Sequence, residues 1–377
     1  MKILALITEY NPFHNGHIYH IEQAKELTEP DVTVAIMSGN FTQRGEIAIT
    51  DKFTRTEAAL EYVDLVAELP LLNAVSSADD FARGGVHIAE KLGATDLVFG
   101  SESGSIDSLI SAARESKLLE DSPEFHKLLK QGYSYPRAVS SLAHNTFLSS
   151  PNDTLGIAYI NALNDLKSSI RPDTIKRIGN KYSDAALSST EFSSATSLRA
   201  ALFSGNNEKA GNFMPESLID KMTEGHLASN EDFFLTLKTL ILTRSPEDLK
   251  KIYMMTEGLE YRLKDKIKKA DSYAEFLSAV KTKRYTWTRL SRLMISILLN
   301  ITDEVMKQYK LTDSVRILGM TKNGQQYLRS LGPLDIITNV NKKNRSLVSH
   351  EVTATEVYNT FTGCRKNDFN TPVIIVP

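Results

Sequence analysis

Short apolar runs alternate with helix-like segments from residue 3 to residue 102, and this alternation restricts the fold more than any other feature. The runs are Ile3–Ile7, Val32–Met37, Val63–Pro70 and Asp96–Glu102, and each has the length and composition of a buried strand. The segments between them place apolar side chains on one helical face. Because strand, helix and strand fit within about 35 residues, the pattern predicts βαβ units. The expected fold is α/β, with a doubly wound, Rossmann-like parallel sheet that binds ligands at the carboxyl ends of its strands.

Length and composition restrict the class of protein. The chain has 377 residues, more than one core usually supports, so we expect two or three domains. It is 41% hydrophobic and 24% charged, as globular proteins are. No stretch approaches the ~20 apolar residues of a membrane span, so we expect a cytoplasmic protein with no membrane partner. The single cysteine, Cys364, excludes an internal disulfide and a multi-cysteine zinc site.

The domain boundaries are predicted from changes in pattern. Ser204–Glu208 is a small polar cluster between periodic segments, which is typical of a linker. We therefore expect an α/β domain at 1–204, a basic helical domain at 205–312 and a small C-terminal α/β unit at 313–377, where strand-like runs return.

Charge is unevenly distributed along the chain. Residues 1–200 carry 18 Lys and Arg against 26 Asp and Glu, whereas the remaining residues carry 26 against 20. The segment 281–292 interleaves cations with Tyr285 and Trp287. Basic side chains contact phosphate and aromatic rings stack on unpaired bases, so this segment is a candidate RNA surface. The alternative is a solvated amphipathic helix with Trp287 in the core, and both interpretations stay open.

The first apolar run leads into the sharpest motif. Pro12 and Gly16 interrupt the chain after Ile3–Ile7, and a helical pattern follows from about His17. His14 and His17 are therefore expected at a helix N-terminus, where free N–H groups and the helix dipole favour phosphate. Gly16 lets a ligand approach the backbone closely. The sequence thus predicts a nucleotide site.

Other chemistries fit this motif less well. His20 lies on the same helical face, but no carboxylate stands at the spacing of a zinc hydrolase, so we expect no metal site. The chain has neither a phosphate-binding P-loop nor a dinucleotide fingerprint after its first strand, which disfavours a P-loop ATPase and a dehydrogenase. Imidazole N–H groups can instead donate to the charge that develops on a phosphoryl group.

A second motif, read together with the histidine motif, gives the chain a resemblance to a known family. His14–His17 after the first strand, together with the Ser- and Thr-rich Ser193–Arg199, resembles the paired signatures of the nucleotidyltransferase superfamily. Further motifs are similar to those of the bacterial tRNA(Met) cytidine acetate ligase family over nearly the whole chain; they are 10–17, 39–46, 64–70, 99–102, 151–156 and 283–286. Asn40 departs from an aspartate associated with that place, so it is given no charged role.

The resemblance implies a ligase reaction. Acetate is activated by ATP, expected with Mg²⁺, to acetyl-adenylate, and the acetyl group is then transferred to N4 of the wobble cytidine of elongator tRNA(Met). Acetate is a poor acyl donor until it forms a mixed anhydride, and the cytosine amine is a weak nucleophile. The motifs assign no residue to acetate and indicate no oligomeric state.

The resemblance also implies an ATP site. His14 and His17 are expected to stabilise the transition state, and Arg177 and Ser197 to contact phosphate. The full set of expected ATP residues is Ile7, Thr8, Glu9, Tyr10, Asn11, Pro12, Phe13, His14, Asn15, Gly16, His17, Ile18, Tyr19, His20, Gly100, Asn152, Arg177 and Ser197.

Further cations are candidates outside that set. Arg44 follows the second strand and is a second-tier candidate for the ligand crevice, although most arginines lie on the surface. The candidates for contacts to tRNA are Lys281, Lys283, Arg284, Arg289 and Arg292.

Two other functions remain as alternatives to the ligase. One is an adenylyltransferase that acts on a small phosphorylated metabolite, disfavoured because the basic second half points to a large anionic partner. The other is a non-catalytic tRNA-binding protein, disfavoured because both histidines and the Ser/Thr motif are intact.

Overall fold

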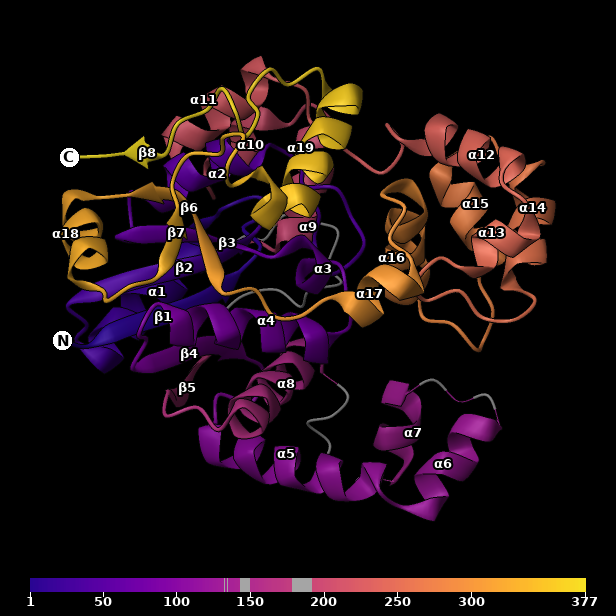
Figure 1. The fold of residues 1–377 in the computed structure, drawn as a ribbon, viewed down its shortest axis with the longest axis horizontal. Coiled ribbons are helices and arrows are strands. Elements are labelled where there is room, and N and C mark those ends of the chain that lie inside the picture. Colours follow the sequence, from indigo (N-terminus) through magenta and orange to yellow (C-terminus); the bar gives the residue numbers. More distant parts are fainter. Residues whose placement is uncertain (132, 134, 143–149, 178–191) are drawn as a thin grey trace.

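The computed structural model describes residues 1–131, 133, 135–142, 150–177 and 192–377. One sheet lies at its centre, with the strand order β5-β4-β1-β2-β3-β6-β7 and with β8 paired to β6 (Figure 1). The strands are β1 Ile3–Thr8, β2 Val32–Ser38, β3 Leu65–Leu69, β4 Asp96–Ser101, β5 Arg171–Lys176, β6 Ser314–Met320, β7 Asp335–Ile337 and β8 Ile374–Ile375.

The five strands from β1 to β5 are parallel to one another, which confirms the predicted doubly wound sheet. β1 lies between β2 and β4, so the strand order reverses there. A crevice forms at such a reversal, outside the carboxyl ends of the strands. β5 ends at Lys176, so Arg177 directly follows its last residue.

Helices cover both faces of the sheet. They are α1 Asn15–Thr28, α2 Lys52–Ala59, α3 Leu71–Ala74, α4 Ala78–Lys91, α5 Ile106–Glu120, α6 Pro123–Lys130, α7 Tyr135–Leu142, α8 Pro151–Leu166, α9 Ala195–Phe203, α10 Asn207–Gly211 and α11 Glu216–Glu224. Successive residues of β1 alternate between two cores, as a strand requires: Ile3 and Ala5 pack with α4 and α8, whereas Leu4 and Leu6 pack with α1, α2 and α9.

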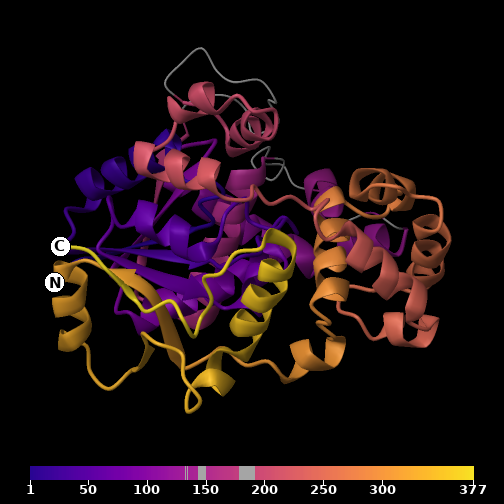
Figure 2. The ribbon, with the colours of Figure 1, turned by 90° about the horizontal axis from the view of Figure 1, so that it is seen from above.

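The helical domain lies beside the sheet (Figures 1 and 2). Its elements are α12 Phe234–Thr243, α13 Pro246–Lys250, α14 Leu259–Ile267, α15 Tyr273–Val280, α16 Trp287–Leu298 and α17 Asp303–Gln308. Leu237, Leu263, Phe276 and Leu293 are among the residues that form its core.

The predicted boundary at residue 205 differs from the structure. Ala210 of α10 and Leu218 and Met222 of α11 pack into the core of the sheet domain. The polar cluster at 204–208 covers the turn between α9 and α10 and the first two residues of α10. A polar turn looks the same in sequence whether the next helix returns to the same core or begins another.

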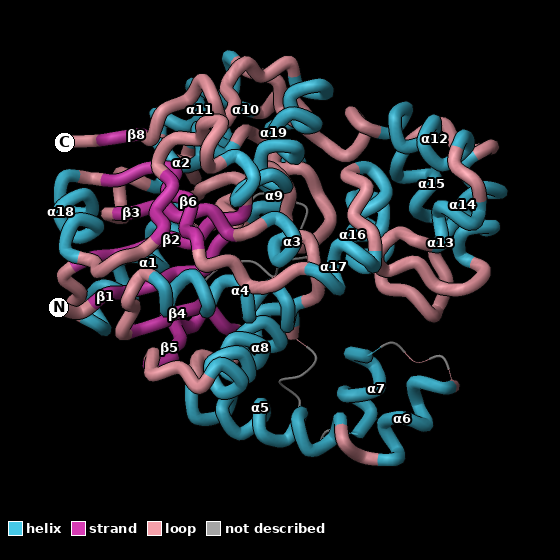
Figure 3. The backbone as a smooth tube through the Cα atoms, in the orientation of Figure 1, coloured by secondary structure: helices cyan, strands magenta, loops and turns pink. Residues whose placement is uncertain are grey.

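Residues 313–377 do not form a sheet of their own, contrary to expectation. β6 pairs antiparallel with β3, and β7 and β8 pair with β6, so this segment extends the central sheet (Figure 3). Its helices are α18 Lys322–Ser330 and α19 Ser349–Thr362, preceded by the 3₁₀ turn η2 Arg345–Val348. The strands were visible in the sequence, but strand pattern does not specify the pairing partner.

A buried ion cluster ties the C-terminal segment to the sheet. Lys52 Nζ of α2 lies 2.7 Å from Glu68 Oε1 of β3 and 2.9 Å from Asp368 Oδ1. Arg316 of β6 lies 3.6 Å from the same Asp368 oxygen. All four side chains are buried, and two cations balance two carboxylates. Removal of one partner from such a cluster leaves an uncompensated buried charge.

Candidate active site

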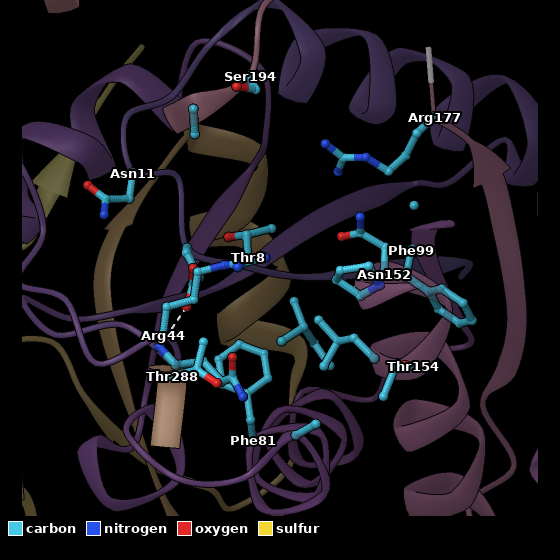
Figure 4. Close-up of a pocket in the computed structure, with 18 of the residues that line it drawn as sticks. Thr8, Asn11, Arg44, Phe81, Phe99, Asn152, Thr154, Arg177, Ser194 and Thr288 are labelled. Atoms are coloured by element: carbon cyan, nitrogen blue, oxygen red, sulfur yellow. Dashed lines mark hydrogen bonds between the residues drawn. The ribbon is translucent and has the colours of Figure 1, made fainter. Parts of the chain in front are cut away.

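A cavity of about 1200 Å³ opens at the carboxyl ends of β1, β4 and β5. Its wall includes Thr8 at the end of β1, Phe99 and Gly100 of β4, and Arg177 after β5. Figure 4 shows Arg177, Phe99 and Asn152 on one side of the cavity, and Arg44 and Thr288 on the other. The cavity is therefore at the place where this fold binds ligands.

His14 and His17 form a reciprocal cap at the N-terminus of α1. His14 Nδ1 accepts from the Gly16 N–H at 3.0 Å, and His17 Nδ1 accepts from the His14 N–H at 3.3 Å. The two rings stack with centroids 3.8 Å apart. Because each Nδ1 acts as an acceptor, each neutral ring carries its proton on Nε2. Both rings thus present an Nε2–H donor at a helix N-terminus.

The histidines are held in their neutral forms. Burial lowers the pKa of His14 to about 3, and Arg177 and Arg199 act in the same direction. Burial, followed by the neighbouring His14, lowers the pKa of His17 well below its ordinary value. Burial and Arg177 also lower the pKa of His20 to about 4. At neutral pH all three rings are therefore uncharged.

We expect these histidines to make the protein sensitive to acid. Their folded-state pKa values lie below the ordinary 6.5, so the unfolded chain takes up protons first as the pH falls. Their stabilising contribution is present above about pH 6.5 and is lost as the pH falls towards 4 and 3. Urea unfolding of the wild type and of His20→Gln at several pH values measures this. The wild-type free energy of unfolding should fall more steeply, and parallel curves would contradict the expectation.

The other expected nucleotide positions converge on the same wall. A Cβ at Gly100 would lie 3.4 Å from Arg177 Cγ, so glycine leaves room for that side chain. The Arg177 N–H donates to the Ser101 carbonyl at 2.9 Å, which fixes the start of its side chain. Asn152 Nδ2 donates to Glu102 Oε1 at 2.6 Å. Gly100, Asn152 and Arg177 all line the cavity.

Some residues of the segment 7–20 line the cavity, and others pack behind its wall. The residues on the wall are Ile7, Thr8, Glu9, Tyr10, Asn11, His14, Gly16, His17, Tyr19 and His20. Pro12, Phe13, Asn15 and Ile18 are not part of the wall. Phe13 is fully buried, and its ring stacks beside that of His17, so it supports the motif from behind.

The structure does not place Ser197 on the wall. The helix begins at Ala195 with Ser194 as its N-cap, so Ser197 falls in the first turn. Its side chain is fully buried, and its hydroxyl donates to the Ser194 carbonyl at 2.8 Å. Ser193 and Ser194 line the cavity instead. The sequence motif located the helix start but not the serines that line the cavity.

Sequence reasoning missed Arg199 and Arg55. Arg199 lines the cavity, donates to the Asn11 carbonyl at 2.8 Å and pairs with Glu46 at 3.1 Å. Arg55 is fully buried and donates to the carbonyls of Glu9 at 2.6 Å, Ser38 at 3.1 Å and Gly39. It therefore joins the loops that follow β1 and β2. Arg199 ends the Ser/Thr motif and could have been chosen for that reason, but nothing in the sequence marks Arg55.

The loop after β2 brings the helical domain to the cavity. Phe41 and Ile47 form a bridge across this loop, which carries Arg44 on the cavity wall (Figure 4). Gly45 adopts φ +75°, and a Cβ there would lie 2.3 Å from the backbone of α16. Arg292 of α16 donates to the Gln43 carbonyl at 3.0 Å. The loop and α16 are thus in direct backbone contact.

The predicted basic surface divides in two. Arg284, Arg289 and Arg292 line the cavity. Lys281 and Lys283 are not part of its wall; Lys281 Nζ lies 5.5 Å from the ring centre of Trp287, and Lys283 is exposed.

The position of Trp287 differs from the alternative interpretation of this segment, which put the residue in the core. Its side chain is 50% exposed, so it is not a core residue. Tyr285 is buried instead, with the Arg289 guanidinium 5.0 Å from its ring centre. Burial lowers the pKa of Arg292 to about 10, so the residue stays charged at neutral pH.

Metal clusters and membrane spans are both absent from the part of the chain that the structure describes. No group of three or more His, Cys, Asp or Glu side chains there has the arrangement of a metal site. No helix there is long and apolar enough to cross a bilayer.

The chain was compared with known proteins. Residues 1–371 match the family model described as HIGH Nucleotidyl Transferase. A tRNA(Met) cytidine acetate ligase of Staphylococcus saprophyticus is 45% identical over 99% of this chain and 100% of its own length. The protein of that name from Staphylococcus carnosus is 42% identical over 100% of this chain and 99% of its own length.

Two solved structures also resemble the chain. Apo Thermotoga maritima TmcAL matches with a TM-score of 0.91 and 35% identity, covering 100% of both chains. The same protein bound to alpha-thio ATP matches with a TM-score of 0.88 and 35% identity, covering 100% of this chain and 99% of its own.

Proposed function

The chain belongs to the HIGH nucleotidyl transferase family, and we propose that it acts as a tRNA(Met) cytidine acetate ligase. It activates acetate with ATP and transfers the acetyl group to N4 of the wobble cytidine of elongator tRNA(Met). One observation carries the proposal: His14 and His17 line the same cavity as Arg284, Arg289 and Arg292 of the basic helical domain. An adenylate formed at the histidines is within reach of an RNA bound by the arginines.

The first step is adenylation. An acetate oxygen attacks the α-phosphorus of ATP, and pyrophosphate leaves. Negative charge builds up on the phosphoryl oxygens, and the Nε2–H groups of His14 and His17 donate to it. Arg177 contributes positive charge at the same wall. Neutral histidines suit this role because they donate hydrogen bonds without having to be desolvated as cations.

Mg²⁺ accompanies ATP in this proposal. The ion is bound mostly by phosphate oxygens and water in nucleotide enzymes, so the chain need not supply a complete cage. The substrate tRNA places the reaction in the cytoplasm.

The deciding experiment follows labelled acetate. The protein is incubated with ATP, Mg²⁺, labelled acetate and elongator tRNA(Met), and the digested nucleosides are analysed for N4-acetylcytidine. Exchange of pyrophosphate into ATP is measured in parallel. Exchange that does not require acetate would favour the adenylyltransferase of small metabolites. Absence of both exchange and acetylcytidine would favour the non-catalytic RNA-binding protein.

We expect Lys283 and Arg284 to contribute to tRNA affinity. Both are exposed, and each phosphate contact that is lost should lower the salt dependence of binding by about one unit of slope. Lys283→Ala/Arg284→Ala is therefore expected to bind tRNA more weakly and with a flatter salt dependence, measured by filter binding at several salt concentrations. Lys342→Ala/Lys343→Ala removes the same charge from an exposed turn and serves as the control. An unchanged slope in the first variant would place the RNA surface elsewhere.

A further inference from the structure

Glu9 is a carboxylate in a cavity that must hold anions. Acetate, triphosphate and RNA are all negatively charged, and arginines from several elements line the wall. A carboxylate repels each of these groups. A carboxylate there can accept a hydrogen bond from a substrate group that carries donors, and can take its proton.

The position of Glu9 is fixed by several contacts. Its Oε1 accepts from the Gln43 N–H at 2.7 Å, and its own carbonyl accepts from Arg55 at 2.6 Å. The Gln43 bond joins the carboxylate to the loop that carries Arg44. An ionised carboxylate has about four acceptor sites, so the bond from Gln43 leaves capacity for a ligand. Glu9 is therefore a hydrogen-bond acceptor in a fixed position, directly after β1.

The surroundings of Glu9 suit a nucleobase. Phe81 and Tyr159 are buried aromatic residues that line the cavity. Burial raises the pKa of Tyr159, and the charge of Glu9 acts in the same direction. Figure 4 shows Phe81 and Arg44 away from Arg177, which belongs to the expected nucleotide side. An aromatic wall with a nearby carboxylate can hold an unpaired base.

We propose that Glu9 accepts a hydrogen bond from the N4 amine of the acceptor cytidine and takes its proton during acetyl transfer. The inference rests on the proposed function. Carboxylates accept from cytosine N4 in nucleic-acid recognition, and uracil offers no donor at that position. Glu9 would therefore contribute to the choice of base as well as to the reaction.

The step balances without a further reagent. The N4 lone pair attacks the carbonyl carbon of acetyl-adenylate, and a C–N bond forms. The C–O bond to the adenylate phosphate breaks, and AMP leaves with that electron pair. The proton released by N4 passes to the Glu9 carboxylate. Burial raises the pKa of Glu9, with Arg44 acting in the opposite direction, which brings the group closer to the value of an effective base near neutral pH.

Glu9→Gln separates the two half-reactions. Glutamine keeps the shape and can still accept from Gln43, but it cannot take a proton. We expect acetate-dependent pyrophosphate exchange to fall much less than acetyl transfer, because adenylation needs no base at N4. Transfer from preformed acetyl-adenylate to tRNA should fall by about 100-fold or more, the usual contribution of a general base.

Controls make each outcome decisive. Glu22→Gln removes the same charge from the exposed surface of α1 and should change neither half-reaction. Equal losses of exchange and transfer in Glu9→Gln would assign Glu9 to ATP or its Mg²⁺ and overturn the inference, as would unchanged transfer. If Glu9→Gln does not fold, the rates of transfer and exchange are compared in Glu9→Asp instead. A loss of transfer at least tenfold greater than the loss of exchange supports the inference, and equal losses refute it. Absence of acetate-dependent exchange in the wild type would instead refute the proposed function.

Discussion

Replacement of His14 or His17 by alanine is expected to reduce acetate-dependent pyrophosphate exchange by roughly 10²–10³-fold, the usual effect of losing one preorganised donor to transition-state charge. Each ring presents an Nε2–H donor because its Nδ1 accepts from the backbone at the start of α1. The effect should appear mainly in kcat, since the donated bonds strengthen as charge develops on the phosphoryl group. Steady-state exchange at saturating ATP and acetate measures it.

The two substitutions should not be additive. The rings stack 3.8 Å apart, and each one takes part in the same capping box, so loss of one displaces the other. The double variant is therefore expected to be only slightly slower than the worse single variant. His126→Ala, on the exposed surface of α6, is the control. If exchange and acetylcytidine yield survived in both single variants, the histidines would have no catalytic role.

Gly45→Ala is expected to have the second largest effect, and it should act mainly on tRNA acetylation. The new Cβ would lie 2.3 Å from the backbone of α16, at a φ of +75°. Overpacking of this kind costs about 1–3 kcal/mol, and the left-handed backbone adds roughly 1 kcal/mol. The loop and α16 must separate, which moves Arg292 and Arg289 relative to the histidines. Transfer to tRNA should fall about tenfold or more, whereas exchange should fall much less.

Gly205→Ala provides a matched control for this effect. Gly205 has φ +77°, but nothing lies within 4 Å of the position that its new Cβ would occupy. Gly205→Ala therefore measures the destabilisation caused by a left-handed backbone alone, without a steric clash of the new Cβ. Urea unfolding and both half-reactions are compared in the two variants. Similar behaviour of both would show that the contact between the loop and α16 does not control transfer.

The sequence predicted those parts of the candidate site that are formed by residues close together in the chain. A strand that ends at Thr8 and a helix that starts at Asn15 place His14 and Gly16 at a helix N-terminus whatever the rest of the fold does. Gly100 and Arg177 were identified through family resemblance, and both line the cavity. Ser197 was expected at phosphate but is buried, because the sequence motif does not separate a capping hydroxyl from one in the first turn of the helix.

The non-local part of the site depended on contacts across the chain. Arg55 acts through carbonyls at the ends of two strands, and no local pattern distinguishes it from a surface arginine. Trp287 was open to two interpretations because amphipathic spacing does not specify which partner covers a helix. The structure shows it half exposed, with Tyr285 buried beside it.

Short-range periodicity and capping chemistry were enough to predict the parallel α/β sheet and the helix that begins at the histidine pair. The remaining arrangement depends on contacts between distant segments of the chain. These contacts join β6 to β3, place α10 and α11 in the first core, and set the loop at Gly45 against α16. These pairings are chosen by burial and shape over hundreds of residues, which a local pattern does not encode. They bring the helix start at His14 and the arginines of the helical domain to one cavity.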